Sequence, residues 1–329
     1  MLTGGADRDG SSQWDRCAAA TPGIDRWCSR TPWMLAVHAA FDDEPARHLG
    51  APVVGAAEHG CVGFVPRLLE DGTPALLPFD AVWAFASAVV TDAPDASCLA
   101  AFVADAVSWI VADERWRLSA WPGLISGSEL DSYVIAALAM FGRVHAGPTT
   151  DRCVASLDGG LDGWLSRRSR TFRRNLRQAD RRGEEVGVRF ETLDDQTPDT
   201  ILRRLHTIER QSWKGRIGSG IETDDMAVLY ATLVHRLSRQ HDVRCTIATL
   251  EGRDVGFVLG GVLGDTYRGL QLSYVDDVGA LSIGRLLQWH ELQRLSDAGV
   301  SAYDLGMDML YKRAWAEQIV STRTLLCIR

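Results

Sequence analysis

The chain has 329 residues, of which 46% are hydrophobic and 24% are charged, and its formal net charge is -8. This length indicates two domains, and this balance is typical of a globular protein with a sizeable core rather than of a disordered chain. The acidic charge argues against a DNA-binding protein or a general nucleic-acid coat, although a local basic patch could still bind phosphate.

Cysteine usage and hydropathy exclude further classes. Seven cysteines are scattered without a CxxC pair, so we expect neither a disulfide framework nor a zinc site, and we predict no metal. The most apolar run, residues 75–90, is interrupted by Pro78 and Asp80 and is shorter than the ~20 residues of a membrane helix. The N-terminus has no apolar core of signal-peptide length. We therefore expect a cytoplasmic protein without a membrane span.

In chain order, residues 1–12 are predicted to be a disordered leader, because they are rich in Gly, Asp and Ser. An N-terminal domain is expected over residues 13–150. Apolar spacing predicts helices at 14–20, 32–40, 99–111 and 129–141, and strands at 52–57, 61–69 and 117–121. No motif in this part indicates a particular chemistry.

The pattern restarts near residue 151, so a second domain is expected over residues 151–329. Its predicted strands are 153–157, 186–193, 243–250, 254–263, 266–274 and 302–306, with one more at 321–328. Its predicted helices are an arginine-rich one within 166–182 and others at 199–213, 224–240 and 283–298.

Lysine is rare in this chain. Of 35 basic residues, only Lys214 and Lys312 are lysines. Where arginine supplies nearly all positive charge, a remaining lysine can be one that is needed as a compact ammonium with an accessible pKa. The alternative is that both are chance residues on the surface.

Several segments of the second domain carry a family resemblance. They are LSYVD at 272–276, LSIGRLL at 281–287, GVSAYDLG at 299–306, YKRAW at 311–315, and RRNLRQADRR at 173–182 before GVRFE. Together they resemble the BioF2-like and Fem-like branch of the GNAT superfamily of N-acyltransferases. The resemblance implies an α/β (α+β) fold with a GNAT-like mixed sheet flanked by helices. Because Fem-like proteins carry two GNAT-like domains side by side, it also implies two tandem GNAT-like domains: a degenerate one at 13–150 and the catalytic one at 151–329.

A donor-binding site is expected where the helix at 283–298 begins. The usual GNAT pyrophosphate loop, Q/R-x-x-G-x-G/A, is reduced here to Ser282, Ile283, Gly284 and Arg285. Free backbone N–H groups and the helix dipole at such a start suit a phosphate. The alternative is a plain helix cap with Ser282 as the N-cap residue.

Three residues near these motifs are the predicted catalytic groups. The resemblance implies that Lys312 of the YK motif lies near the donor or the oxyanion, where an ammonium would stabilise negative charge or hold a phosphate. Asp304 could accept the proton of the attacking amine, or it could be a structural carboxylate that caps the next turn. Tyr274 could be a general acid toward a leaving thiol, or it could pack in the core.

The segment from Glu209 to Lys214 is a second candidate. Related sequences carry an E-x-x-x-W-K segment that faces the acceptor cleft, so Glu209 could bind or deprotonate the acceptor amine and Trp213 could wall its pocket. The alternative is a helix-terminal ion pair beside a packed indole. Lys214 is assigned to acceptor binding together with Tyr303 and Tyr311.

The arginine-rich helix with its preceding turn, residues 166–182, contains eight arginines. Arg173, Arg174 and Arg177 could contact tRNA or another phosphate. The alternative is an ordinary solvated face, since acidic residues follow closely in the sequence.

Three functions are consistent with these patterns. The first is an N-acyltransferase that moves an acyl group from acyl-CoA to an amine of a small metabolite or peptide by direct attack. The second is a Fem-like transferase that takes its donor from aminoacyl-tRNA and forms an amide or peptide bond. Against this second function, the sequence lacks two common Fem features, a coiled-coil arm and a net basic charge. The third is a GNAT-like module that binds a ligand without catalysis.

Overall fold

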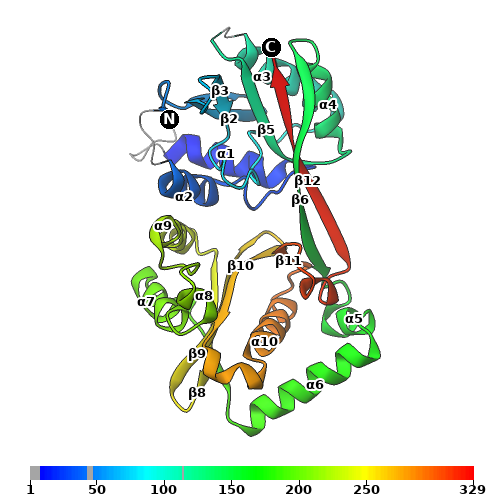
Figure 1. Ribbon diagram of the computed structural model, residues 1–329. Helices are drawn as coiled ribbons and strands as arrows, with labels where there is room; N and C mark the ends of the chain where they lie inside the picture. The colour runs from blue at the N-terminus through cyan, green and yellow to red at the C-terminus, as the bar shows by residue number, and fades with distance from the viewer. Residues whose placement is uncertain (1–7, 43–46, 113–114) are drawn as a thin grey trace. The chain divides into compact units, whose positions relative to one another are not determined.

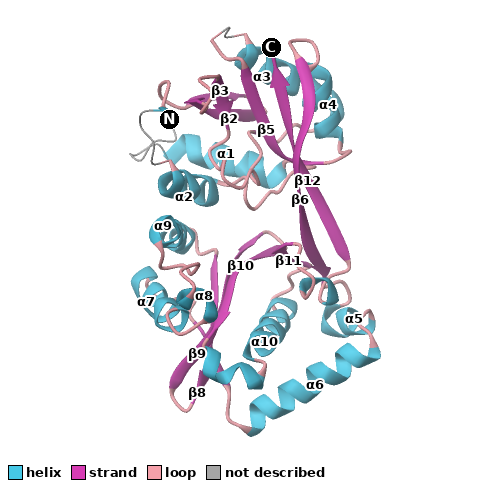
Figure 2. Ribbon diagram, viewed as in Figure 1, coloured by secondary structure: helices cyan, strands magenta, loops and turns pink. Residues whose placement is uncertain are grey.

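The computed structural model describes residues 8–42, 47–112 and 115–329. They divide into two compact units (Figures 1 and 2). Unit 1 comprises the described residues up to Asp151 together with Ser321–Arg329, and unit 2 comprises Arg152–Val320. Residues 1–7 of the expected leader lie outside the described residues. The prediction of disorder is wrong for residues 8–12, because a helix, α1, begins at Arg8.

Unit 1 follows the predicted order of helices and strands, with two short strands added. Its elements are α1 (Arg8–Ala20), α2 (Thr31–Phe41), β1 (Val53–Ala57), β2 (Gly60–Leu68), β3 (Pro74–Leu77), β4 (Val89–Thr91), α3 (Ala96–Val111), β5 (Leu118–Ile125) and α4 (Glu129–Leu138). Its sheet is mixed, since β3 pairs with β5 in parallel and β2 pairs with β3 antiparallel.

The remaining elements lie mostly in unit 2. They are β6 (Arg143–Ser156), α5 (Gly160–Ser166), α6 (Arg170–Glu185), β7 (Arg189–Thr192), α7 (Pro198–Glu209), α8 (Trp213–Arg216), α9 (Asp224–Arg239), β8 (Val243–Leu250), β9 (Arg253–Leu263), β10 (Thr266–Tyr274), η2 (Asp276–Leu281), α10 (Ile283–Asp297), β11 (Ala302–Met307), η3 (Lys312–Ala314) and β12 (Gln318–Ile328). Strands β6 and β12 each pass from one unit into the other. The strand order in unit 2 is β6-β11-β10-β9-β8-β7, and only β10 and β11 run parallel.

Helices cover both faces of the unit 2 sheet (Figure 1): α7 packs on one side of β9 and β10, and α10 packs on the other. The core beside α10 is aromatic, with Trp164, Trp289, Trp315, Tyr267 and Tyr303 buried in one cluster. This cluster holds α5, α6 and the end of β11 together, so it fixes the elements that surround the start of α10.

In unit 1, the segment after β3 folds over a buried carboxylate. Asp80 is fully buried, and its Oδ2 accepts hydrogen bonds from Trp33 Nε1 at 3.2 Å, Phe85 N at 2.9 Å and Ala86 N at 2.8 Å. Burial raises the pKa of Asp80 to about 7. Gly123 of β5 has φ +72°, and a Cβ there would lie 2.5 Å from the Phe85 carbonyl oxygen, so the segment packs directly on β5.

Two searches cover the part of the chain that the structure describes. None of its helices combines the length and the apolar character needed to cross a membrane. In the same residues, no group of three or more His, Cys, Asp or Glu side chains is placed to hold a metal ion.

Candidate active site

The parallel strands β10 and β11 separate along their length. Their register pairs three residues of each strand and ends at Arg268 opposite Asp304, although β10 continues to Tyr274. The pairing of β10 with β9 is irregular just after Gly269, and such an irregularity bends a strand. The later half of β10 therefore lies apart from β11.

A pocket of about 580 Å³ lies where the two strands separate. This volume is within the range of about 300–1,000 Å³ that is usual for small-molecule sites. Its lining residues are Phe172, Trp213, Lys214, Val258, Gly269, Leu270, Gln271, Leu272, Tyr274, Gly284, Arg285, Gln288, Tyr303, Leu305, Met309, Tyr311, Lys312, Ala314 and Trp315. The pocket therefore brings together α6, α8, β10, α10, β11 and η3.

Both lysines of the chain line this pocket. Lys214 Nζ donates to Gln271 Oε1 at 3.0 Å and to the Leu272 carbonyl oxygen of β10 at 2.9 Å. Lys312 Nζ donates to the carbonyl oxygen of Met307, at the end of β11, at 3.0 Å. Each of the two separating strands therefore has an ammonium group bound to its main chain at the pocket.

The two amines differ in their electrostatic surroundings. Burial lowers the pKa of Lys214, and the carboxylate of Glu209 opposes this shift. Burial lowers the pKa of Lys312 to about 8, and repulsion from Arg268 acts in the same direction. Lys312 is thus a lysine whose charge changes close to neutral pH.

The predicted donor-binding segment is only partly in the pocket. Ser282 precedes α10 in a left-handed conformation with φ 58° and makes no side-chain cap, so it is not a side-chain N-cap. The side chain of Ile283 is fully buried. Gly284 and Arg285 do line the pocket. A Cβ at Gly284 would lie 2.9 Å from Tyr274 Cε1, so this glycine makes room for the tyrosine ring, and Arg285 is exposed.

The remaining aromatic candidates form the walls and the mouth. Tyr274, Tyr303, Tyr311 and Trp213 all line the pocket. Tyr303 is 2% exposed, and burial raises its pKa well above the usual value. Trp213 and Tyr311 are about half exposed, at 49% and 58%. Tyr303 therefore lies deep in the pocket, and the other two lie at its opening.

Glu209 does not line the pocket. It is fully buried, and its carboxylate accepts hydrogen bonds from Ser212 Oγ at 3.2 Å, Ile221 N at 3.2 Å and Gln271 Nε2 at 3.4 Å. These bonds fold the segment that carries α8 and link Glu209 through Gln271 to Lys214. The geometry supports a positioning role, and sequence reasoning had not singled out Gln271.

Asp304 is also turned away from the pocket lining. It is 5% exposed, forms an ion pair with Arg152, and accepts hydrogen bonds from Arg268 Nη1 at 2.6 Å and from Gly306 N at 2.8 Å. The last bond is the turn cap that was the structural alternative. Two guanidinium groups already occupy this carboxylate.

The arginines of α6 follow one side of the helix. Arg174 and Arg177 are exposed, and with Arg170 and Arg181 they have the i, i+4, i+7, i+11 spacing of one helix face. Arg173 is half-buried and donates to a carbonyl of α5 at 3.3 Å. The exposed basic face therefore includes two of the three predicted phosphate contacts.

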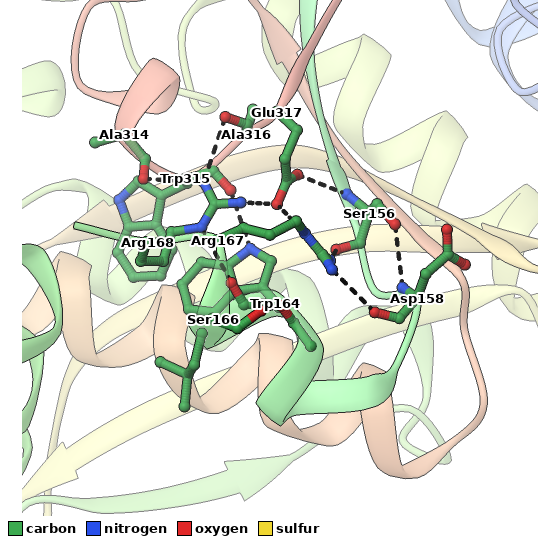
Figure 3. A network of polar contacts seen from close by, with 12 residues as sticks. Ser156, Asp158, Trp164, Ser166, Arg167, Arg168, Ala314, Trp315, Ala316 and Glu317 are labelled. Atoms are coloured by element: carbon green, nitrogen blue, oxygen red, sulfur yellow. Dashed lines mark hydrogen bonds and ion pairs between the residues drawn. The ribbon is translucent and has the colours of Figure 1, made fainter. Parts of the chain in front are cut away.

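A network around Arg168 holds the segment after η3 (Figure 3). Arg168 is 7% exposed, and its Nη1 lies 3.3 Å from the carbonyl oxygens of both Ala314 and Ala316. It also pairs with Glu317 and stacks over the Trp164 ring at 4.8 Å. The sequence signal was the i, i+4 spacing of Trp164 and Arg168, which sequence reasoning did not use.

Trp164 completes this network, which we name the Arg168 clamp: Trp164, Arg168 and Glu317 with the carbonyl groups of residues 314–316. Trp164 Nε1 donates to the carbonyl oxygen of Trp315 at 3.1 Å (Figure 3). The Trp315 ring in turn packs on Phe172 with centroids 5.2 Å apart, and both rings line the pocket. Three consecutive carbonyl groups are thus held directly after Lys312.

Comparisons with known proteins identify the fold. Residues 170–313 match the family described as Acetyltransferase (GNAT) domain. The structure is similar to FemX, with a TM-score of 0.67, 11% identity and coverage of 95% of each chain. It is also similar to a conserved protein of unknown function from Bacteroides thetaiotaomicron VPI-5482, with a TM-score of 0.64, 12% identity and 97% coverage of each chain.

A further similar structure is the C-terminal domain of a putative lysylphosphatidylglycerol synthetase from Agrobacterium fabrum, with a TM-score of 0.52, 16% identity and coverage of 89% of this chain and 91% of that one. No curated protein matches the sequence. At such identities the solved structures show the fold, and the matched domain contains both pocket lysines. Residues 170–313 thus match a GNAT domain, the overall fold is similar to that of FemX, and the expected fold of mixed sheets flanked by helices is confirmed.

Proposed function

We propose that this protein is an N-acyltransferase that moves an acyl group from acyl-CoA to the amine of a small metabolite or peptide by direct attack. The observation that carries the proposal is the pocket between β10 and β11, with an ammonium group on each of the separating strands. Acyl transfer passes through a tetrahedral oxyanion, which fixed positive charges in a partly dry pocket stabilise.

The proposed reaction assigns roles to the residues of the pocket. The phosphates of the donor would bind at the start of α10, near Gly284 and Arg285. The amine nitrogen bonds to the acyl carbon, the carbon–sulfur bond breaks, and the thiolate receives the proton that the nitrogen loses. Lys312 would stabilise the oxyanion, and Tyr274 would relay this proton, donating its own to the leaving sulfur and recovering the one that the nitrogen loses.

For the two carboxylates, the observed contacts favour structural roles. Asp304 already binds two guanidinium groups and a main-chain N–H. Glu209 is fully buried behind Gln271. We therefore assign Glu209 and Asp304 to positioning and propose that the attacking amine enters in its neutral form.

A second candidate is the aminoacyl-tRNA-dependent reaction. The exposed arginine face of α6 begins two residues before Phe172, a pocket residue, and regularly spaced arginines suit a phosphate backbone. The similar folds include FemX and a domain of a protein named for lysylphosphatidylglycerol synthesis. The donor segment here also has Arg285 as its single arginine.

One experiment separates these readings. The purified protein is mixed with acetyl-CoA, longer acyl-CoAs or charged tRNA and a panel of amines, and amide formation and thermal shift are measured. Turnover with acyl-CoA that Arg285→Met weakens supports the first reaction. Turnover only with charged tRNA, weakened by Arg174→Met with Arg177→Met, supports the second. Binding without amide formation from any donor would support a non-catalytic ligand-binding module and contradict both.

A further inference from the structure

The pocket has an unusual charge for an acidic protein. The chain carries a net charge of -8, yet the pocket is lined by Lys214, Lys312 and Arg285, and none of the described residues that line it is Asp or Glu. Three cations without a lining carboxylate favour anionic ligands, because like charges that share a pocket give it a positive potential.

Two of these cations, Lys214 and Arg285, lie on opposite faces of β10. A Cβ at Gly284 would contact the side chains of Tyr274 at 2.9 Å and Leu272 at 3.3 Å, so these two side chains face α10 and its Arg285. Gln271 contacts Glu209 and Lys214 instead. Successive residues of a strand point to opposite faces, so Lys214 and Arg285 approach the pocket from different sides of the strand. One anion at Arg285 does not account for the charge at Lys214.

Lys214 is also held more firmly than a surface lysine. Gln271 accepts from its ammonium at 3.0 Å and donates to Glu209 at 3.4 Å, and the Leu272 carbonyl oxygen accepts at 2.9 Å. An ammonium has three N–H donors, so the bonds found within the described residues leave one of them for a ligand. Glu209 lies behind Gln271 and helps to keep the amine charged.

We propose that the acceptor amine is itself an anion, carrying a carboxylate or a phosphate group that Lys214 binds while the donor occupies the Arg285 side. This rests on the proposed function, since it names the acceptor class of that same site. Lys214 thereby selects the acceptor, Gln271 and Glu209 position Lys214, and Lys312 remains available for the reaction centre.

The test uses two pairs of amine probes that differ in one anionic group: β-alanine with β-alaninamide, and O-phosphoethanolamine with ethanolamine. Binding to the full-length protein is measured by isothermal titration calorimetry without a donor, so the result does not depend on turnover. In at least one pair, we expect the member with the anionic group to bind roughly tenfold or more tightly than the member without it, as one charge-assisted hydrogen bond implies. The pair with the larger difference tells carboxylate from phosphate.

Variants locate the effect. Lys214→Met should remove the discrimination, and Gln271→Leu should reduce it because the ammonium loses a partner. Arg285→Met should leave the discrimination intact, as should the control Arg239→Met, which removes an exposed arginine of α9. The proposal is overturned if probes with and without the anionic group bind alike, if neither probe with the anionic group binds, or if Arg285→Met abolishes the discrimination instead. If Lys214 confers charge-selective binding but no amide forms, only the proposed reaction is contradicted.

Discussion

The two pocket lysines differ in what surrounds their ammonium groups. Lys214 has two hydrogen-bond acceptors and a buried carboxylate behind them. Lys312 has one main-chain acceptor and Arg268 nearby, and its pKa is lowered to about 8. When two side chains of the same type lie in one site but have different surroundings, they commonly have different roles. The oxyanion role therefore makes a pH-dependent prediction for Lys312.

If the ammonium form of Lys312 is the active one, its contribution is present below about pH 8 and is lost as the pH rises through that value. Lys312→Arg keeps the charge and should not show this loss, whereas Lys312→Met should lower kcat by about 10²–10³ below pH 8 and by progressively less above it. Since the acceptor amine titrates as well, the ratio of the wild-type rate to the Lys312→Arg rate is the quantity to measure. A ratio that rises through pH 8, or full turnover by both variants, contradicts the assignment.

Asp80 gives a prediction about stability rather than catalysis. Its folded pKa of about 7 lies above the ordinary 3.8 because of burial, so the folded state holds the proton more tightly. This contribution is fully present below about pH 4 and is lost as the pH rises to about 7, with a slope of at most about 1.4 kcal/mol per pH unit. Asp80→Asn stays neutral and should be more stable than the wild type at pH 8 by urea unfolding. An unchanged difference between the two proteins from pH 4 to 8 would be inconsistent with this.

Sequence reasoning singled out the two lysines that line the pocket, but it could not choose between the two roles that it left open for each carboxylate. Lys214 and Lys312 stand out because they are the only lysines in an arginine-rich sequence, and this is visible without knowledge of the fold. The environment of Asp304 depends on Arg152 and Arg268, which reach it from two other strands. That of Glu209 depends on Gln271, 62 residues away. Such partners are brought together only by the register of the sheet.

At the scale of elements, the Arg168 clamp and the separation of β10 from β11 together define the pocket. The clamp joins the turn between α5 and α6 to the segment that follows η3. Sequence patterns predicted nearly every helix and strand here, because apolar periodicity is a local property. The clamp and the early end of the β10–β11 pairing are tertiary features, and no local pattern encodes them.

Removing Arg168 should therefore affect both stability and the site. Arg168→Met leaves Glu317 without one ion-pair partner and frees two carbonyl groups, which we expect to lower the free energy of unfolding by about 2–4 kcal/mol. It should also loosen Lys312 and lower kcat more than it raises KM. Urea unfolding and steady-state kinetics measure the two effects. The matched control is Arg239→Met on α9, and equal behaviour of the two variants would argue against the clamp.

At the scale of the whole molecule, a negative protein presents a positive pocket. At low ionic strength, a net charge of -8 repels anionic substrates over a screening length of ~30 Å, whereas at 0.15 M salt this length is ~8 Å. The pocket cations act at shorter range. For an anionic donor, kcat/KM should therefore rise as salt is increased from about 0.01 M to 0.1 M and fall near 1 M. If kcat/KM instead falls steadily from the lowest salt concentration, the positive pocket rather than the net charge of the protein controls the association of the anionic donor at every distance.

Because arginine supplies every other basic side chain, the pocket contains all the lysine side chains of the protein. Amine-reactive esters, ordinarily unselective surface labels, should thus act on this protein as active-site reagents apart from the chain's terminal amine. Burial lowers the pKa of both lysines, and the pKa of Lys312, at about 8, makes its amine nucleophilic at mild pH. Reactive thioesters could acylate these lysines in the same way, so the mass of the intact protein would report how far the pocket has been acylated.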